Sequence, residues 1–129
     1  MTPLSYADLA SVEGRVLPAS DWVAVPQSRI DAFAACTGDD QWIHVDVERA
    51  RGGPFGSPIA HGSLTLSLLV PMLVSVGVFP EDGTTVVNYG IDALRYLAPV
   101  PSGARVRVHA EIRKVRPKGR NRYLASVHC

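Results

Sequence analysis

At 129 residues the chain is long enough for one compact domain with a single core and leaves little room for a second. Apolar residues make up 47% and charged residues 19%, a balance that is typical of globular proteins and excludes extensive disorder. The net charge is +1, but eight of the 13 basic residues lie between positions 105 and 122. This basic segment is either the solvated face of a strand hairpin, which we favour, or a surface that attracts a phosphate-bearing ligand.

The cysteines and the apolar segment near the middle of the chain bear on where the protein works. Cys36 and Cys129 form no disulfide framework, and we expect Cys36 to be a small core residue on an apolar helix face. No basic segment followed by an apolar stretch opens the chain, which favours the cytoplasm. Residues 63–79 carry no charge, but Pro71 and several hydroxyl side chains interrupt them, and the flanking anchors of a membrane span are absent. We therefore predict a buried helix and no membrane partner. No nucleic acid is expected as a partner either.

The first 60 residues predict short helices, one strand and a long loop. Pro26 suits the first turn of a helix, and Gly38 is a natural end for it because glycine readily adopts the left-handed conformation. The loop after Gly38 runs as far as Ala60. The other predicted elements are a short helix over Ser5–Glu13 ended by Gly14, a strand over Trp22–Val25 and one helical turn over Val47–Ala50.

The second half predicts one long helix followed by antiparallel strands. Residues 61–77 are apolar around nearly the whole circumference of a helix, and a helix of that kind is buried on all sides. Apolar residues then alternate, most clearly in a strand over Ala104–Lys114, where Val106, Val108, Ala110 and Ile112 face one way. The other predicted strands are Thr84–Tyr89, Leu94–Ala98 and Arg122–His128, with a hairpin turn at 118–121. This order indicates an α+β fold with an antiparallel sheet wrapped around a central helix.

The densest polar cluster lies just after the predicted helix end, between Thr37 and Asp46. Asp39 and His44 are five residues apart there, so a carboxylate and an imidazole can converge on one small molecule, as general acid–base chemistry near neutral pH requires. The alternative is structural, because an Asp after a Gly often caps or turns the chain and a loop His is often only hydrogen-bonded. The spacing alone favours the functional interpretation only slightly.

A second candidate site is the start of the long helix at His61-Gly62-Ser63. Backbone N–H groups at a helix start lack internal partners, and the helix dipole favours negative charge there. Gly62 has no side chain to obstruct a ligand, so this position can stabilise the oxygen of a thioester enolate. Taken alone, the simpler interpretation is that Gly62 permits close packing and His61 bonds a loop carbonyl.

Together these motifs resemble the hydratase motif of the MaoC-like dehydratases. Thr37-Gly38-Asp39-Asp40-Gln41-Trp42-Ile43-His44 is followed by Ala60-His61-Gly62, and the stretches 87–96 and 98–103 also agree, so the resemblance covers roughly residues 15–115. It implies a single hot-dog domain over residues 1–129 and an (R)-specific enoyl-CoA hydratase. It also implies that Asp39 and His44 are the catalytic acid–base pair and that the Gly62 N–H binds the thioester oxygen.

The same resemblance brings further expectations and some departures. Asp40 does not match the catalytic position, Gln41 and Trp42 replace the usual Asn and Pro, and Val70 stands where family members place a serine. Family members usually continue for another strand beyond the position of Cys129, so we expect the domain to lack that strand, with its place left open or covered by another chain. We assign substrate-binding roles to Trp42, His61, Asn88 and Tyr89.

The expected partners are an acyl-CoA substrate and a second copy of the chain in a homodimer. No metal or redox cofactor is expected, because the thioester itself acidifies the carbon beside it. Two alternatives stay open: a hot-dog acyl-CoA thioesterase, and a non-catalytic acyl-CoA-binding subunit of a heteromeric hydratase.

Overall fold

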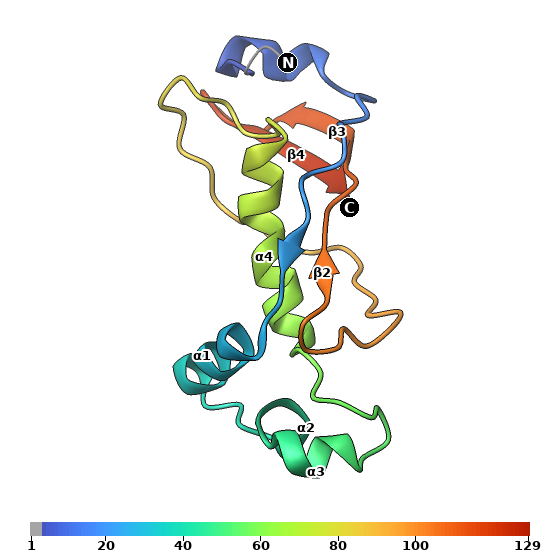
Figure 1. The fold of residues 1–129 in the computed structure, drawn as a ribbon. Coiled ribbons are helices and arrows are strands. Elements are labelled where there is room, and N and C mark those ends of the chain that lie inside the picture. The colour runs from blue at the N-terminus through green and yellow to red at the C-terminus, as the bar shows by residue number, and fades with distance from the viewer. Residues whose placement is uncertain (1–3) are drawn as a thin grey trace. The chain divides into compact units, whose positions relative to one another are not determined.

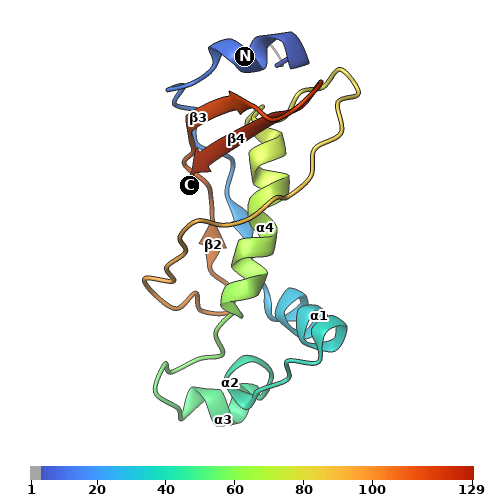
Figure 2. The ribbon, with the colours of Figure 1, turned by 180° about the vertical axis from the view of Figure 1, so that it is seen from behind.

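The computed structural model describes residues 4–129, in two compact units. The first unit comprises residues 1–21, 70–90 and 107–129, and the second comprises residues 22–69 and 91–106. Figure 1 labels the helices and strands, and Figure 2 shows them from behind. Each unit has its own buried side chains and is taken by itself below.

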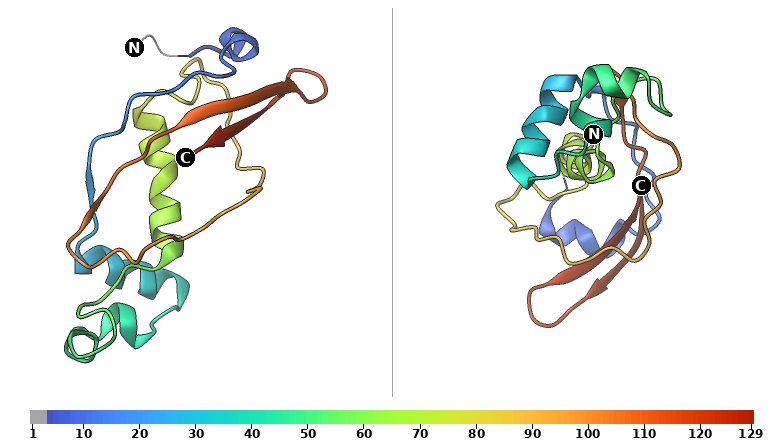
Figure 3. Two further views of the ribbon diagram at one scale, coloured as in Figure 1. Left: turned by 90° about the vertical axis from the view of Figure 1, so that its right-hand side faces the viewer. Right: turned by 90° about the horizontal axis from the view of Figure 1, so that it is seen from below.

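The second unit is mainly helical and holds the polar motifs of the sequence. It contains α1 (Gln27–Thr37), α2 (Trp42–Val45), α3 (Val47–Arg51) and the first part of α4 (Gly62–Ser75). A short antiparallel pair joins β1 (Val23–Ala24) to β2 (Arg105–Val106). In both views of Figure 3, α1 lies beside the first turns of α4. Ile30 of α1 and Leu64 of α4 meet there in a buried cluster that also includes Val25 and Ala60.

The predicted helix after Pro26 is confirmed, including its end. Gly38 follows the last turn of α1 with a φ of 82°, and its N–H donates to the Ala34 carbonyl at 2.8 Å. A left-handed residue at this position satisfies a carbonyl that the helix itself leaves free. Because the chain turns sharply at Gly38, Asp39 leaves the helix at a fixed point.

Cys36 contradicts our expectation of a core residue, since its side chain is exposed. The buried residues of α1 are Ile30 and Ala34. Cys36 lies two residues beyond Ala34, which corresponds to a rotation of about 200° around the helix axis. It therefore points away from the buried side. Both Cys36 and Cys129 are free thiols, as predicted.

The long helix is confirmed over Gly62–Ser75, with Pro71 inside it, but its burial is not uniform. Leu64, Met72 and Leu73 are buried, whereas Val74 is 52% exposed. The prediction that this helix is buried on all sides is therefore wrong for the described chain. No helix in the described part is long and apolar enough to cross a membrane.

The first unit contains a 3₁₀ helix, η1 (Tyr6–Ser11), and a hairpin of β3 (Glu111–Pro117) and β4 (Tyr123–His128). The hairpin turn forms where the sequence predicts it, with the Lys118 N–H donating to the Arg122 carbonyl at 2.9 Å. The predicted alternation is confirmed for Val108, Ala110 and Ile112, which are buried while the side chains between them are not. Val106 is only partly buried, and the predicted strand over Ala104–Lys114 is interrupted between β2 and β3. Residues 14–20 add further antiparallel backbone bonds along this strand.

Two predicted strands, Thr84–Tyr89 and Leu94–Ala98, are not formed in the described structure. A strand is defined by backbone bonds to a neighbour, and no bridge or ladder includes these segments. Their apolar side chains are correspondingly open to solvent, with Val87 77% and Leu97 92% exposed. The pattern of a strand is present in the sequence, but the described chain supplies no partner for it.

Candidate active site

His44 is held in place by a contact between its ring and the main chain of Ile59, which the sequence did not reveal. His44 lies in α2, a four-residue helix within a segment predicted to be loop. The ring is only 7% exposed, and its Nδ1 lies 2.7 Å from the Ile59 carbonyl oxygen. The Ile59 N–H in turn donates to the Ile43 carbonyl at 3.0 Å. These contacts tie α2 to the segment that leads into α4.

Gln27, in the first turn of α1, fixes α2 from the other side. Its Nε2 donates to the His44 carbonyl oxygen at 2.7 Å and to Asp31 Oδ1 at 2.9 Å. One amide group therefore joins the first turn of α1 to the helix that carries the candidate catalytic histidine. Sequence reasoning missed Gln27, because nothing in its spacing from His44 distinguishes it from an ordinary polar residue at a helix start.

Asp39 follows the left-handed Gly38 and is exposed. Its backbone is held at both ends: the N–H donates to Thr37 Oγ1 at 3.3 Å, and the carbonyl oxygen lies 2.8 Å from His61 Nε2. The carboxylate takes part in none of these bonds and stays free for chemistry. The simpler interpretation of His61, a bond to a loop carbonyl, is thus present in the structure, with Asp39 supplying the carbonyl, and the substrate-binding role assigned to His61 stays a prediction.

The structure brings Asp39, His44 and His61 together. One carboxylate oxygen and one ring nitrogen from each histidine all lie within 4.8 Å of one another. The two imidazole rings stack, with centroids 3.8 Å apart and an interplanar angle of 22°. A carboxylate and an imidazole at this separation can hold one water molecule between them and move its proton.

The same three side chains are the kinds of ligand that bind a transition metal, but their arrangement fits one poorly. Imidazole lone pairs lie in the plane of the ring, and a metal bound by two histidines must lie near both planes. Two rings stacked 22° from parallel direct their lone pairs side by side rather than to one point. The set is better suited to a proton and a water molecule.

Gly62 begins α4 directly after His61, as predicted. The ring of Tyr96 packs against its α-carbon so closely that a β-carbon at position 62 would lie 2.9 Å from the ring. An alanine at position 62 would therefore force the Tyr96 ring to shift, independently of any ligand. Tyr96 is 55% exposed, and sequence reasoning did not single it out.

The other predicted substrate-binding residues have contacts of their own. The Arg49 guanidinium carbon lies 4.2 Å from the centroid of the Trp42 ring. The same ring is so close to Gly53 that a β-carbon there would lie 3.0 Å from it. Asn88 and Tyr89 belong to the first unit, where Lys118 Nζ lies 3.6 Å from the centroid of the Tyr89 ring. A hydrogen bond from Lys118 and its positive charge lower the pKa of the Tyr89 hydroxyl. The substrate-binding roles of these three residues stay predictions.

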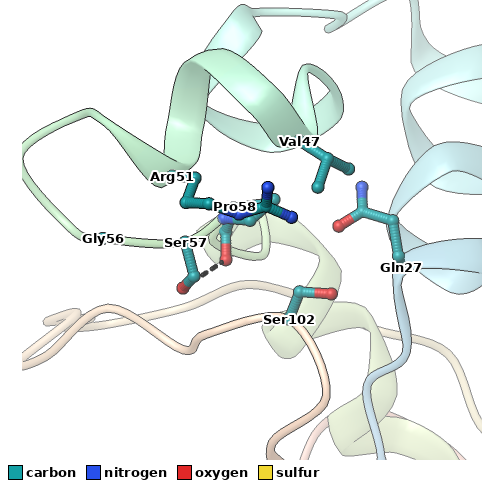
Figure 4. A pocket seen from close by; sticks show the side chains of 7 residues that line it. All are labelled: Gln27, Val47, Arg51, Gly56, Ser57, Pro58 and Ser102. Atoms are coloured by element: carbon teal, nitrogen blue, oxygen red, sulfur yellow. Dashed lines mark hydrogen bonds between the residues drawn. The ribbon is translucent and has the colours of Figure 1, made fainter.

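A cavity of about 250 Å³ lies elsewhere in the second unit (Figure 4). It is lined by Gln27, Val47, Arg51, Gly56, Ser57, Pro58 and Ser102. The Oε1 atom of Gln27 is buried and has no partner in the described structure. Neither the Asp39 carboxylate nor Gly62 contributes to the lining, so this cavity is not where we place the reaction.

Comparisons with known proteins agree with this fold. A family profile described as "MaoC like domain" matches residues 8–127. The chain is 45% identical over 123 residues to 3-hydroxyacyl-thioester dehydratase Z of Mycobacterium tuberculosis, which covers 95% of this chain and 81% of that protein. It is 48% identical over 108 residues to nodulation protein N of Rhizobium leguminosarum bv. viciae, covering 83% and 67%.

Among solved structures, the chain is similar to an R-hydratase from Pseudomonas aeruginosa in its unliganded form. That likeness has a TM-score of 0.70 and 27% identity, and covers 97% of this chain and 75% of the other. These comparisons confirm the predicted α+β fold of the hot-dog type.

Proposed function

Because the chain belongs to the MaoC-like domain family, we propose that it is an (R)-specific enoyl-CoA hydratase. Such an enzyme adds water reversibly to a trans-2-enoyl-CoA and gives an (R)-3-hydroxyacyl-CoA. The observation that carries the proposal is the convergence of the Asp39 carboxylate with the His44 and His61 rings immediately before α4. The dehydratase and hydratase names of the relatives support the same class of reaction.

In the proposed reaction the Asp39 carboxylate removes one proton from water while the water oxygen bonds to C3 of the substrate. The electrons of the double bond move towards the thioester and form an enolate. The proton on Asp39 then passes to C2, and the thioester carbonyl forms again. The second proton of the water remains on the new hydroxyl group, so atoms and charge balance. One carboxylate serving both carbons adds hydrogen and hydroxyl to the same face.

His44 orients the water in this scheme. The Ile59 carbonyl can only accept a hydrogen bond, so the proton of the neutral His44 ring is on Nδ1. Nε2 then carries a lone pair that accepts the second hydrogen of the water, while Asp39 takes the first. Positioned acid–base groups of this kind contribute roughly 10²–10⁴-fold to a rate.

The Gly62 N–H is the proposed donor to the thioester oxygen, where negative charge develops. A donor aimed at such an oxygen contributes roughly 3–4 kcal/mol in known enzymes, and the dipole of α4 strengthens it. The proposed reaction includes no metal or redox cofactor, since the thioester already makes C2 acidic enough once its oxygen is stabilised.

A homodimer is part of the proposal. Segments 84–89 and 94–98 carry the residue pattern of strands but have no strand partner in the described chain. Unpaired backbone with exposed apolar side chains readily pairs with another chain. A second copy would supply that partner by adding strands to this one.

The test is a hydration assay of the whole chain with crotonyl-CoA, followed by loss of the enoyl absorbance and by the chirality of the product. The proposal expects consumption of the enoyl thioester and formation of the (R)-3-hydroxyacyl product. Release of free thiol instead would identify a thioesterase. Tight binding of acyl-CoA with no reaction would identify a non-catalytic subunit, and either result overturns the proposal.

A further inference from the structure

Each histidine of the site has one ring nitrogen bound to a carbonyl oxygen. For His44 it is Nδ1, at 2.7 Å from the Ile59 carbonyl, and for His61 it is Nε2, at 2.8 Å from the Asp39 carbonyl. A carbonyl oxygen has no hydrogen to give, so both of these nitrogens must be the donors. The contacts therefore fix opposite tautomers: a neutral His44 is protonated on Nδ1, and a neutral His61 on Nε2.

His61 touches both members of the candidate catalytic pair. Its Nε2–H holds the main chain of Asp39, and one face of its ring stacks on His44. The rings of Phe33 and His61 have their centroids 4.8 Å apart and an interplanar angle of 55°. His61 itself is only 2% exposed. A ring enclosed in this way has little freedom to move, so it fixes whatever it contacts.

The remaining nitrogen of His61 is unusual. Nδ1 is buried and has no hydrogen-bond partner among the described residues. A buried polar atom without a protein partner calls for an explanation, such as a catalytic role or a bound water.

From these contacts we propose that His61 is a positioning residue, acting through the Asp39 main chain and the His44 ring rather than by binding substrate. The inference rests on the proposed hydratase function. Asp39 lies in an exposed stretch, where its backbone is held by the His61 bond and by a longer bond to Thr37. Loss of the His61 bond frees the Asp39 carboxylate to move relative to His44. A displacement of about 1 Å between reacting groups can cost on the order of 10²-fold in rate.

Substitutions at position 61 separate this role from simple space filling. A glutamine amide nitrogen reaches about as far as histidine Nε2, whereas that of asparagine reaches only about as far as Nδ1. His61→Gln therefore restores the donor to the Asp39 carbonyl, and His61→Asn is its matched control without that reach. His61→Phe keeps an aromatic ring in contact with His44 and Phe33 but has no donor.

We expect kcat for crotonyl-CoA hydration to fall by about tenfold to a hundredfold in His61→Asn and His61→Phe, with KM changed by less than about threefold. His61→Gln should regain about tenfold over His61→Asn. Near-ultraviolet circular dichroism gives the folded fraction of each variant, and each kcat is expressed per folded molecule. Equal kcat values for glutamine and asparagine, or a change in KM alone, would overturn the inference.

A second measurement keeps this test separate from that of the function. The ¹⁵N shifts of the His44 ring report which nitrogen carries the proton, whether or not the protein turns over substrate. We expect wild type and His61→Asn both to show the Nδ1–H form, because the Ile59 carbonyl fixes it, with the His44 ring resonances shifted in the variant because the stacked ring is gone. An unchanged His44 spectrum in that variant contradicts the positioning role. An inactive wild type with the expected spectra contradicts only the hydratase proposal.

Discussion

At the residue scale, the candidate site depends on bonds from side chain to main chain. The His44 ring reaches the Ile59 carbonyl, the His61 ring reaches the Asp39 carbonyl, and the Gln27 amide reaches the His44 carbonyl. Each bond ties together segments that are 15 or more residues apart in sequence. These bonds hold the main chain on which the exposed Asp39 carboxylate is carried, and acid–base catalysis requires such fixed positions.

The adjacent aspartates give the sharpest residue-scale prediction. Asp39→Asn keeps the shape of the side chain but removes the base, so we expect kcat for crotonyl-CoA hydration to fall by roughly 10²–10⁴-fold. His44→Ala should fall within the same range. Asp40→Asn is the matched control, since it makes the same change one residue away on another exposed side chain, and its kcat should stay within about threefold of wild type. Equal losses in Asp39→Asn and Asp40→Asn would contradict the assignment.

Gly62 needs a prediction that separates packing from ligand access. Gly62→Ala places a methyl group 2.9 Å from the Tyr96 ring, so we expect it to lower the free energy of unfolding by about 1–3 kcal/mol in a urea titration. Tyr96→Ala in the same chain removes the clash and should restore stability to that of Tyr96→Ala alone. If hydration remains impaired in the stable double variant, the methyl group obstructs the substrate. Full activity there would show that Gly62 serves packing only.

At the element scale, a single carboxylate links the start of η1 to the loop after α4 within the first unit. Asp82 Oδ2 accepts from the Tyr6 N–H at 2.6 Å, and its Oδ1 accepts from Thr84. The bonds from Thr84 and Tyr6 lower the pKa of the Asp82 carboxyl below its ordinary value of 3.8. The folded state therefore favours the ionised form of this side chain more than the unfolded state does.

The pH dependence of stability follows from that direction. Because the folded pKa is the lower one, the contribution of Asp82 is complete above pH 3.8 and is lost as the pH falls towards the folded value. We expect Asp82→Asn to flatten the loss of stability below about pH 5, measured as urea midpoints across that range. Asp8 has a pKa lowered by Ser5 in the same way, against a smaller opposing effect of the Asp82 charge, so Asp8→Asn should act in the same direction. Parallel curves for wild type and Asp82→Asn would contradict the link.

At this scale the sequence predicts the elements that local contacts determine, and it misses those that depend on hydrogen bonds from distant segments. The end of α1 at Gly38 and the buried face of Val108, Ala110 and Ile112 follow from local rules, and both formed as expected. The helix α2 was missed because its four residues are held by Gln27 and Ile59 from other segments. The pairing of Asp39 with His44 was visible as a spacing, whereas the His61 bond to Asp39 and the Tyr96 ring over Gly62 required the chain to be folded.

At the scale of the whole molecule, a stretch of exposed apolar residues is the main departure from an ordinary monomer surface. Isolated exposed apolar side chains are common, so exposed ones matter here because they follow one another closely along the sequence. The side chains in question are Val86, Val87, Tyr89, Ile91, Leu94, Tyr96 and Leu97. They coincide with the two segments that have the pattern of strands and no strand partner.

If a second copy covers this stretch, a charge placed in it should break the dimer. Leu97 is 92% exposed, so Leu97→Glu removes no packing within the chain, yet it would bury an unpaired carboxylate in a dimer interface. We expect light scattering to show a dimer for wild type and a monomer for Leu97→Glu. Val16→Glu, at a side chain that is 74% exposed outside the stretch, is the control and should remain dimeric. A monomeric wild type would contradict the homodimer, whereas a Leu97→Glu protein that stays dimeric would place the interface elsewhere.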